Sequence, residues 1–143
     1  MRPAFVEDPL YRKGLRIRKQ VLGPETVANR LKSTTRYTRG FEELTTKAAW
    51  GLIWSRPGLS RRIRSFINLG VLTALGQPHE LRLHIRAALR NGVSRDEISE
   101  AILHCTVYCG IPRAADARRI MCAVFDEIDA ARTRTVAKKP RRK

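Results

Sequence analysis

An acidic residue and a histidine stand four positions apart in the segment PHELRLHIRAALR. Four residues make about one turn of an α-helix, so Glu80 and His84 would lie on one helix edge, where their side chains can touch. A carboxylate beside an imidazole favours the charged imidazolium and fixes which ring nitrogen is free, as a general acid near neutral pH requires. The alternative is an ordinary surface ion pair, because such pairs are frequent and individually weak. His79 is expected to point to the opposite face, toward solvent.

Arginines are concentrated in the stretch before this segment. Arg64 lies about 100° around the helix from Ile63, at the edge of an expected buried stripe. From there its planar guanidinium is placed to reach into a cavity and hold a carboxylate at two points. Arg61 and Arg62 are expected to be more exposed. The alternative is that these arginines are solubilising surface charges.

A second edge carries His104 and Tyr108, one helical turn apart, on a helix that begins near Arg95. The start is predicted by Ser94-x-x-Glu97, a capping box in which each side chain satisfies an otherwise unpaired backbone N–H. Glu97 is thereby occupied and is not a catalytic candidate. In one interpretation His104 and Tyr108 face a cleft, and in the other His104 is an ordinary interior histidine.

The three cysteines, Cys105, Cys109 and Cys122, are an odd number in one region, which is poor material for disulfides and fits a reducing cytosol. Cys105 and Cys109 are spaced C-x-x-x-C away from a helix start, so they lack the C-x-x-C arrangement that lowers a thiol pKa. Core packing is expected for all three, because free cysteine is among the most buried residue types. We predict no metal site.

The chain of 143 residues has a formal net charge of +16, and its 43% hydrophobic residues suffice for one core. Residues 132–143 are basic, without acidic side chains, so we expect a disordered tail after a single domain of residues 1–131. Such a charge attracts polyanions, and equally a small carboxylate with several charges. No stretch approaches the roughly 20 apolar residues that span a bilayer, and no secretion signal is evident, so a soluble cytoplasmic protein is expected.

Breakers such as Gly23-Pro24 and Gly76 divide the chain into helical lengths, with almost no alternation of β-branched residues to suggest a sheet. Apolar residues recur at spacings of three and four in the third of these lengths, at Phe41, Leu44, Ala48 and Leu52. We therefore predict an all-α bundle of about six to seven helices, at about residues 8–22, 25–31, 37–53, 60–75, 78–90, 95–110 and 113–131.

Three stretches carry a resemblance that spans about residues 11–125. They read YRKGLRIRKQVLG, AAWGLIWSRPGLSRRIRS and LTALGQPHELRLHIRAALRNGVSRDEISEAILHCTVYCGIPRAA. Order, spacing and residue identity agree over unusual motifs, including W-S-R-P-G-L and H-x-x-x-A-x-x-N-G-V. The chain resembles the carboxymuconolactone decarboxylase family, and within it the stand-alone γ-carboxymuconolactone decarboxylases.

The resemblance implies an all-α fold like that of alkylhydroperoxidase D, in which a redox C-x-x-C pair stands shortly before a histidine. The corresponding positions here read Gln77-Pro78-His79-Glu80, followed by His84, so the thiols are absent and Glu80 replaces the second cysteine. The resemblance also implies trimers or hexamers with sites near subunit contacts. The implied reaction is cofactor-free loss of carbon dioxide from γ-carboxymuconolactone to give β-ketoadipate enol-lactone, a step in aromatic catabolism.

The resemblance further assigns hypothetical roles to the residues singled out above. Catalysis falls to His84 as proton donor, positioned by Glu80. Arg64 and Arg56 are expected to bind the carboxylates of the substrate. Trp54 is expected to form an apolar wall, and Tyr108 or His104 to donate a hydrogen bond to the lactone oxygen.

Two other functions stay open at this point. The same fold with Cys105 and Cys109 as a redox pair would be a thiol peroxidase. A basic tail and an arginine-rich loop would bind nucleic acid through phosphate contacts, with strong salt dependence. The partners we expect are a small dicarboxylate lactone and further copies of the chain, rather than a membrane or nucleic acid.

Overall fold

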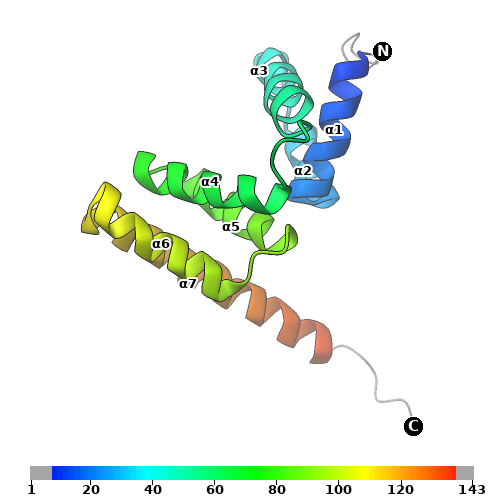
Figure 1. Ribbon diagram of the computed structural model, residues 1–143. Helices are drawn as coiled ribbons and strands as arrows, with labels where there is room; N and C mark the ends of the chain where they lie inside the picture. Colours follow the sequence, from blue (N-terminus) through cyan, green and yellow to red (C-terminus); the bar gives the residue numbers. More distant parts are fainter. Residues whose placement is uncertain (1–7, 138–143) are drawn as a thin grey trace. The chain divides into compact units, whose positions relative to one another are not determined.

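The computed structural model describes residues 8–137 (Figure 1). Within this range the chain contains seven α-helices, one π-helical segment and no strand, which confirms the all-α class. None of the helices is both long enough and apolar enough to cross a membrane. In chain order the elements are α1 (Pro9–Leu22), α2 (Pro24–Lys32), α3 (Arg39–Thr45), η2 (Thr46–Ile53), α4 (Arg61–Leu75), α5 (Pro78–Arg90), α6 (Arg95–Cys109) and α7 (Ile111–Ala137).

Helix boundaries follow the breakers and caps of the sequence. The Asp8 carboxylate accepts a hydrogen bond of 2.7 Å from the Leu10 backbone N–H and so caps α1. Ser94 and Glu97 form the predicted capping box at the start of α6. Gly76, directly after α4, has a φ of +62°, a left-handed conformation that glycine adopts without steric cost.

The last helix is longer than predicted. It continues to Ala137, six residues beyond the expected end. The hydroxyls of Thr133 and Thr135 donate to backbone carbonyls four residues earlier, at 3.0 and 2.9 Å, and no glycine or proline interrupts this segment. Of the expected disordered tail, residues 132–143, the part through Ala137 is therefore helical, whereas residues 138–143 lie outside the described range.

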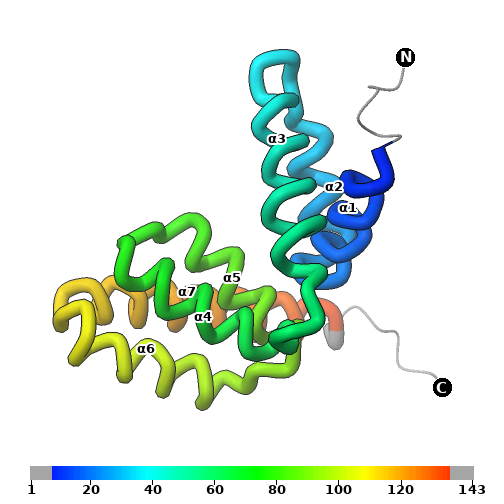
Figure 2. The backbone as a smooth tube through the Cα atoms, turned by 45° about the horizontal axis from the view of Figure 1, so that its top comes forward, coloured from blue at the N-terminus to red at the C-terminus, as the bar shows by residue number. Residues whose placement is uncertain are grey.

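The predicted third helix changes its hydrogen bonding part way along. α3 runs directly into η2, and Figure 2 shows the two as one continuous coil. The backbone N–H of Trp54 donates to the carbonyl of Ala49, five residues earlier, at 2.8 Å. This wider hydrogen-bonded ring turns the side chains around the axis relative to an α-helix.

The chain forms two compact units, and each is described by itself. The first comprises Met1–Phe66 and Ala87–Val93, and the second comprises Ile67–Arg86 and Ser94–Lys143. α4 and α5 each contribute residues to both units.

In the first unit, two glycines let α1 and η2 approach each other with their backbones in contact. A Cβ at Gly14 would overlap the carbonyl oxygen of Thr46, and one at Gly51 would lie 2.9 Å from the carbonyl oxygen of Leu10. Real Cβ atoms do not approach backbone atoms this closely, so neither position accepts a side chain unless the helices separate. The close contact fixes the distance between the two elements.

A buried charge cluster joins the same elements. Arg18 is 1% exposed, and its Nη1 donates to Glu42 Oε2 at 2.8 Å and to Thr46 Oγ1 at 3.0 Å. Arg30 Nε donates to the second oxygen, Glu42 Oε1, at 2.9 Å. Burial alone would raise the pKa of Glu42, but the hydrogen bonds and charges of the two arginines outweigh it, so the pKa is lowered. Glu42 therefore stays charged inside the unit.

Because of this cluster, the continuous helix of α3 and η2 buries a different face from the one that its apolar pattern predicts. Glu42, Thr46 and Trp50 are buried, at 6%, 0% and 5% exposure, whereas Phe41 and Leu44 are more than half exposed. The helix is correctly predicted, but pairing with Arg18 decides its orientation. The expected buried stripe around Ile63 on α4 is also wrong, because this side chain is 45% exposed.

In the second unit, α6 packs along α7, as Figure 2 also shows. The ion pairs of this unit lie at its surface: Arg82 and Arg86 of α5 both contact Glu127 of α7, and Arg95 of α6 contacts Asp129 at 2.6 Å. Its interior is mainly apolar and includes Leu69, Leu81, Ile85, Ile98, Ile102, Ala117 and Val124, with Thr73 and His84 as buried polar residues. The unit is therefore held mainly by apolar burial, since exposed ion pairs contribute little.

Replacement of Glu42 by alanine should lower the free energy of unfolding by about 3–5 kcal/mol, because it leaves the buried Arg18 charge without its partner. Urea denaturation followed by circular dichroism measures this change. Glu43→Ala is the matched control, since Glu43 pairs with Lys47 near the surface and its loss should cost less than about 1 kcal/mol. Equal losses for the two variants would contradict the assigned role of the cluster.

Candidate active site

His84 lies on α5 with only 8% of its surface exposed. Its Nδ1 is 3.2 Å from the side-chain amide nitrogen of Asn68 on α4. An amide nitrogen can only donate, so Nδ1 accepts and the proton of the neutral ring lies on Nε2. α4 thereby fixes both the orientation and the tautomer of the imidazole.

Burial lowers the pKa of His84, and the nearby charge of Glu80 opposes the shift without cancelling it. The expectation that Glu80 keeps the ring as an imidazolium near neutral pH is therefore wrong. The structure favours a neutral ring.

Glu80 stands in the first turn of α5 and is partly buried. Its charge acts on the imidazole and raises the pKa of His84, as expected for two residues one helical turn apart. His79 is exposed, as the helix geometry predicts. The spacing of the two residues could not indicate whether the carboxylate or burial has the larger effect on the pKa of His84. That depends on the packing of α5 against other helices.

His104 and Tyr108 stack on each other, with ring centroids 4.7 Å apart and the planes tilted by 36°. Both are exposed, Tyr108 by 78%, so the interpretation of His104 as an interior histidine is wrong. The pair forms an aromatic and polar patch on the outer face of α6. Glu97 is occupied by its cap, as predicted.

The tryptophan and the arginines expected to bind substrate belong to the first unit. The rings of Trp54 and the buried Trp50 have centroids 5.2 Å apart. Arg64 Nη2 donates to the backbone carbonyl of Arg56 at 3.1 Å, and the side chain of Arg56 is exposed. Arg64 Nε is buried and has no hydrogen-bond partner among the described residues. In the first unit Arg64 thus contacts the Arg56 backbone, and in the second unit the charge of Glu80 acts on His84.

The cysteines do not form a reactive pair. Burial, with a contribution from Cys109, raises the pKa of the Cys105 thiol, which disfavours the nucleophilic thiolate. The Cys109 thiol donates to the carbonyl of Cys105 at 3.0 Å. Core packing is confirmed for Cys105, whereas Cys109 is partly exposed and Cys122 is exposed. Among residues 8–137, no three metal-binding side chains converge as a metal ion would require.

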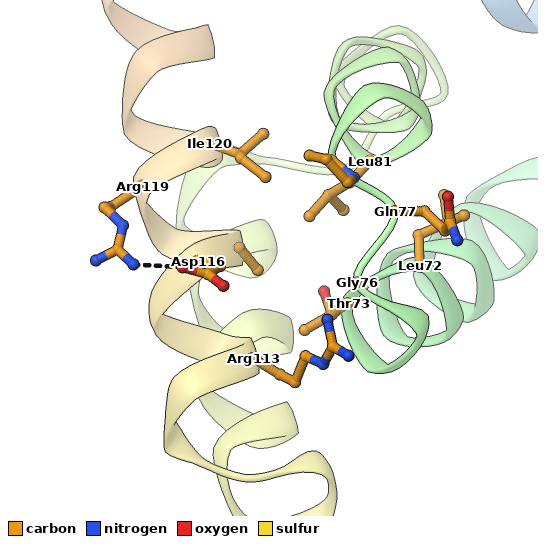
Figure 3. A pocket seen from close by; sticks show the side chains of 11 residues that line it. Leu72, Thr73, Gly76, Gln77, Leu81, Arg113, Asp116, Arg119 and Ile120 are labelled. Carbon is orange, nitrogen blue, oxygen red and sulfur yellow. Dashed lines mark hydrogen bonds and ion pairs between the residues drawn. The ribbon is translucent and has the colours of Figure 1, made fainter.

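Two features of the structure were missed by the sequence reasoning. Asn68 has a detectable signal, since a polar amide within the apolar helix segment SFINLGVL is unfavourable unless it has a specific partner. The other is a pocket of about 330 Å³ in the second unit, lined in part by Thr73, Gly76 and Arg113 (Figure 3). No local pattern predicts it, because Gly76 and Arg113 are far apart in sequence.

Comparisons with known proteins agree with the resemblance. The model of the carboxymuconolactone decarboxylase family matches residues 39–122. The 4-carboxymuconolactone decarboxylase of Acinetobacter baylyi is 40% identical over 87% of this chain and 93% of its own length. The nitrosuccinic acid decarboxylase of Metarhizium robertsii is 47% identical over 76% of each chain.

The family match covers more than half of the chain and includes the whole of α5, on which His84 and Glu80 lie. It also covers α4, which supplies Asn68. With its all-helical fold and a relative that aligns over nearly the full length, the chain belongs to the carboxymuconolactone decarboxylase family.

Proposed function

We propose that this chain is a carboxy-lyase that removes carbon dioxide from γ-carboxymuconolactone without a cofactor and yields β-ketoadipate enol-lactone. The observation that carries the proposal is the buried imidazole of His84, oriented by Asn68 and accompanied by Glu80, in a member of this family. The relative from Acinetobacter baylyi, which bears the name of this activity, supports it.

The reaction needs a sink for the electrons of the breaking bond. The departing carboxylate of this substrate is joined through a ring double bond to the lactone carbonyl, so the electron pair delocalises onto that oxygen as a dienolate. Carbon dioxide leaves, and one ring carbon then takes up a proton. Catalysis therefore requires binding of the carboxylates and stabilisation of the developing oxyanion.

The neutral state of His84 changes the role first assigned to it. A neutral ring cannot pass its Nε2 proton to carbon without becoming a strongly basic imidazolate, so in this proposal it donates a hydrogen bond to the dienolate oxygen. The proton that carbon takes up then comes from water. Glu80 is a positioning residue, whose charge partly offsets the effect of burial on the ring.

Arg64 is the proposed carboxylate ligand with the most direct structural support. Its Nε is buried without a hydrogen-bond partner in the described part of the chain, and such a group costs free energy until an acceptor reaches it. Nε and one Nη of a guanidinium form the fork that holds a carboxylate at two points. Arg56, whose backbone carbonyl contacts Arg64, is proposed to add a second positive charge through its side chain, and Trp54 an apolar wall.

A second candidate substrate is nitrosuccinate, because the 47% identical relative is named for its decarboxylation. A nitro group on the carbon that loses carbon dioxide is likewise an electron sink, so the same hydrogen-bond donor and arginines would serve. Both compounds are dicarboxylates that lose carbon dioxide to leave a delocalised anion. Turnover of each by the purified chain decides between them.

The purified protein should change the ultraviolet absorbance of γ-carboxymuconolactone and release carbon dioxide. His84→Ala should lower kcat by about 10²–10³-fold with little change in KM, because the lost hydrogen bond acts mainly in the transition state. His79→Ala, at the exposed neighbour on the same helix, should behave as wild type. Wild-type turnover in His84→Ala would remove the assignment.

Activity should persist through neutral pH and fall only on acidification, as His84 becomes protonated. The lowered pKa places this loss below the ordinary histidine value of 6.5, whereas an imidazolium acid would lose activity as pH rises.

The same lowered pKa of His84 makes the stability of the fold depend on pH. The unfolded state binds the proton more readily than the folded state. The contribution of neutral His84 to the free energy of unfolding is therefore fully present above pH 6.5, and it is lost as pH falls toward the lowered pKa of the folded state. Urea denaturation of wild type and His84→Gln at several pH values would show whether the dependence belongs to this residue.

We also propose that the chain assembles into a trimer or hexamer. On α6 and just beyond it, four large side chains are more than 60% exposed, which is unusual for a monomer surface: Leu103, Val107, Tyr108 and Ile111. Val107→Glu should reduce the mass measured by light scattering after gel filtration, because a charge cannot be buried cheaply at an apolar contact. Glu100→Lys, exposed on the same helix, is the control. A monomeric wild-type chain would refute the assembly.

A further inference from the structure

The pocket of about 330 Å³ in the second unit lies where α4 ends and α5 begins, against the first half of α7 (Figure 3). Its volume is within the range of small-molecule sites. The lining includes neither His84 and Glu80 nor Arg56 and Arg64. The residues proposed for decarboxylation therefore do not account for this pocket, and its ligand must be inferred from its own lining.

Thr73 supplies an unused hydroxyl to this pocket. The residue is 1% exposed, and its Oγ1 has no hydrogen-bond partner among residues 8–137. A threonine in a helix commonly donates to the carbonyl four residues earlier, as Thr133 and Thr135 do in α7. Thr73 does not, so a buried donor remains for an acceptor that enters the pocket.

Arg113 brings a positive charge to the same end of the pocket. Its guanidinium lies over Gly76, where a Cβ would overlap Nη1. The backbone N–H of Gly76 donates to the carbonyl of Thr73 at 3.1 Å, so these two residues share the last turn of α4. Arg113 and Thr73 thus both line the pocket at the C-terminal end of α4.

The remaining charges of the pocket compensate each other. Asp116 and Arg119 form an ion pair on α7, visible as the dashed line in Figure 3. No carboxylate of the described residues pairs with Arg113. The net charge of the lining is therefore one positive charge, located at Arg113. The rest of the wall is largely apolar and includes Leu72, Leu81, Ala117 and Ile120.

We propose that this pocket binds a small organic carboxylate, distinct from the decarboxylation site. The carboxylate accepts hydrogen bonds from the Arg113 guanidinium and from Thr73 Oγ1, and a single ring or short chain packs against the apolar wall. A charged head and an apolar body are both required, because the pocket offers one cation and one unused donor beside a mainly hydrocarbon surface.

Benzoate is the probe for this site, titrated into the full chain by calorimetry. It should bind, and Arg113→Met and Thr73→Val should each weaken the affinity by at least about tenfold, a typical effect of losing one hydrogen bond to a charged group. Arg118→Met is the matched control, because Arg118 is exposed on the same helix and outside the pocket, and its affinity should be unchanged. Thermal melting verifies that each variant is folded, and the exposed Arg113 carries the test if Thr73→Val unfolds.

Two further ligands test the chemistry. Benzamide, which has the ring without the charge, and inorganic phosphate, which has the charge without the ring, should both bind much more weakly than benzoate. The proposal is overturned if benzoate does not bind, if benzamide binds equally well, or if Arg113→Met leaves the affinity unchanged. Benzoate affinity should also survive His84→Ala. Its loss there would place the ligand at the decarboxylation site instead and refute a separate pocket.

Discussion

The burial of the His84 imidazole away from water determines its protonation state, on which the proposed chemistry depends. A ring in solvent beside a carboxylate would gain a proton, but His84 is packed so that burial outweighs the charge of Glu80. The neutral ring then has one donor and one acceptor, and Asn68 occupies the acceptor. The packing of α5 thus favours the neutral form of the ring before any substrate binds.

The first unit deals with buried charge in the opposite way. Arg18 and Glu42 are as buried as His84, but both keep their charges because hydrogen bonds from Arg18 and Arg30 satisfy both carboxylate oxygens. Histidine can escape the cost of burial by losing its proton at ordinary pH, whereas arginine cannot. In the first unit, buried charges are therefore stabilised by ion pairing, because arginine cannot lose its proton. In the second unit, burial favours the neutral form of histidine, which loses its proton at ordinary pH.

Helix positions could be predicted from the sequence because their determinants are local. Gly76, Pro78 and the Ser94–Glu97 box act within a few residues. The orientation of α3 and η2 could not be predicted, since it depends on Arg18, which lies 24 residues before Glu42. The influence of the Glu80 charge on His84 follows from helix geometry, but the direction of the pKa shift depends on tertiary packing. The same limit hid the pocket, whose walls come from three helices.

Gly76 meets two independent requirements at one position. Its backbone needs a conformation that other residues adopt only with strain, and the guanidinium of Arg113 occupies the space of any side chain. The two requirements differ in strictness, because the exposed, flexible side chain of Arg113 can move aside whereas the backbone conformation cannot change without altering the turn between α4 and α5. The turn itself is therefore what keeps a glycine at this position, and a substitution there would strain the connection between two helices rather than only crowd one arginine.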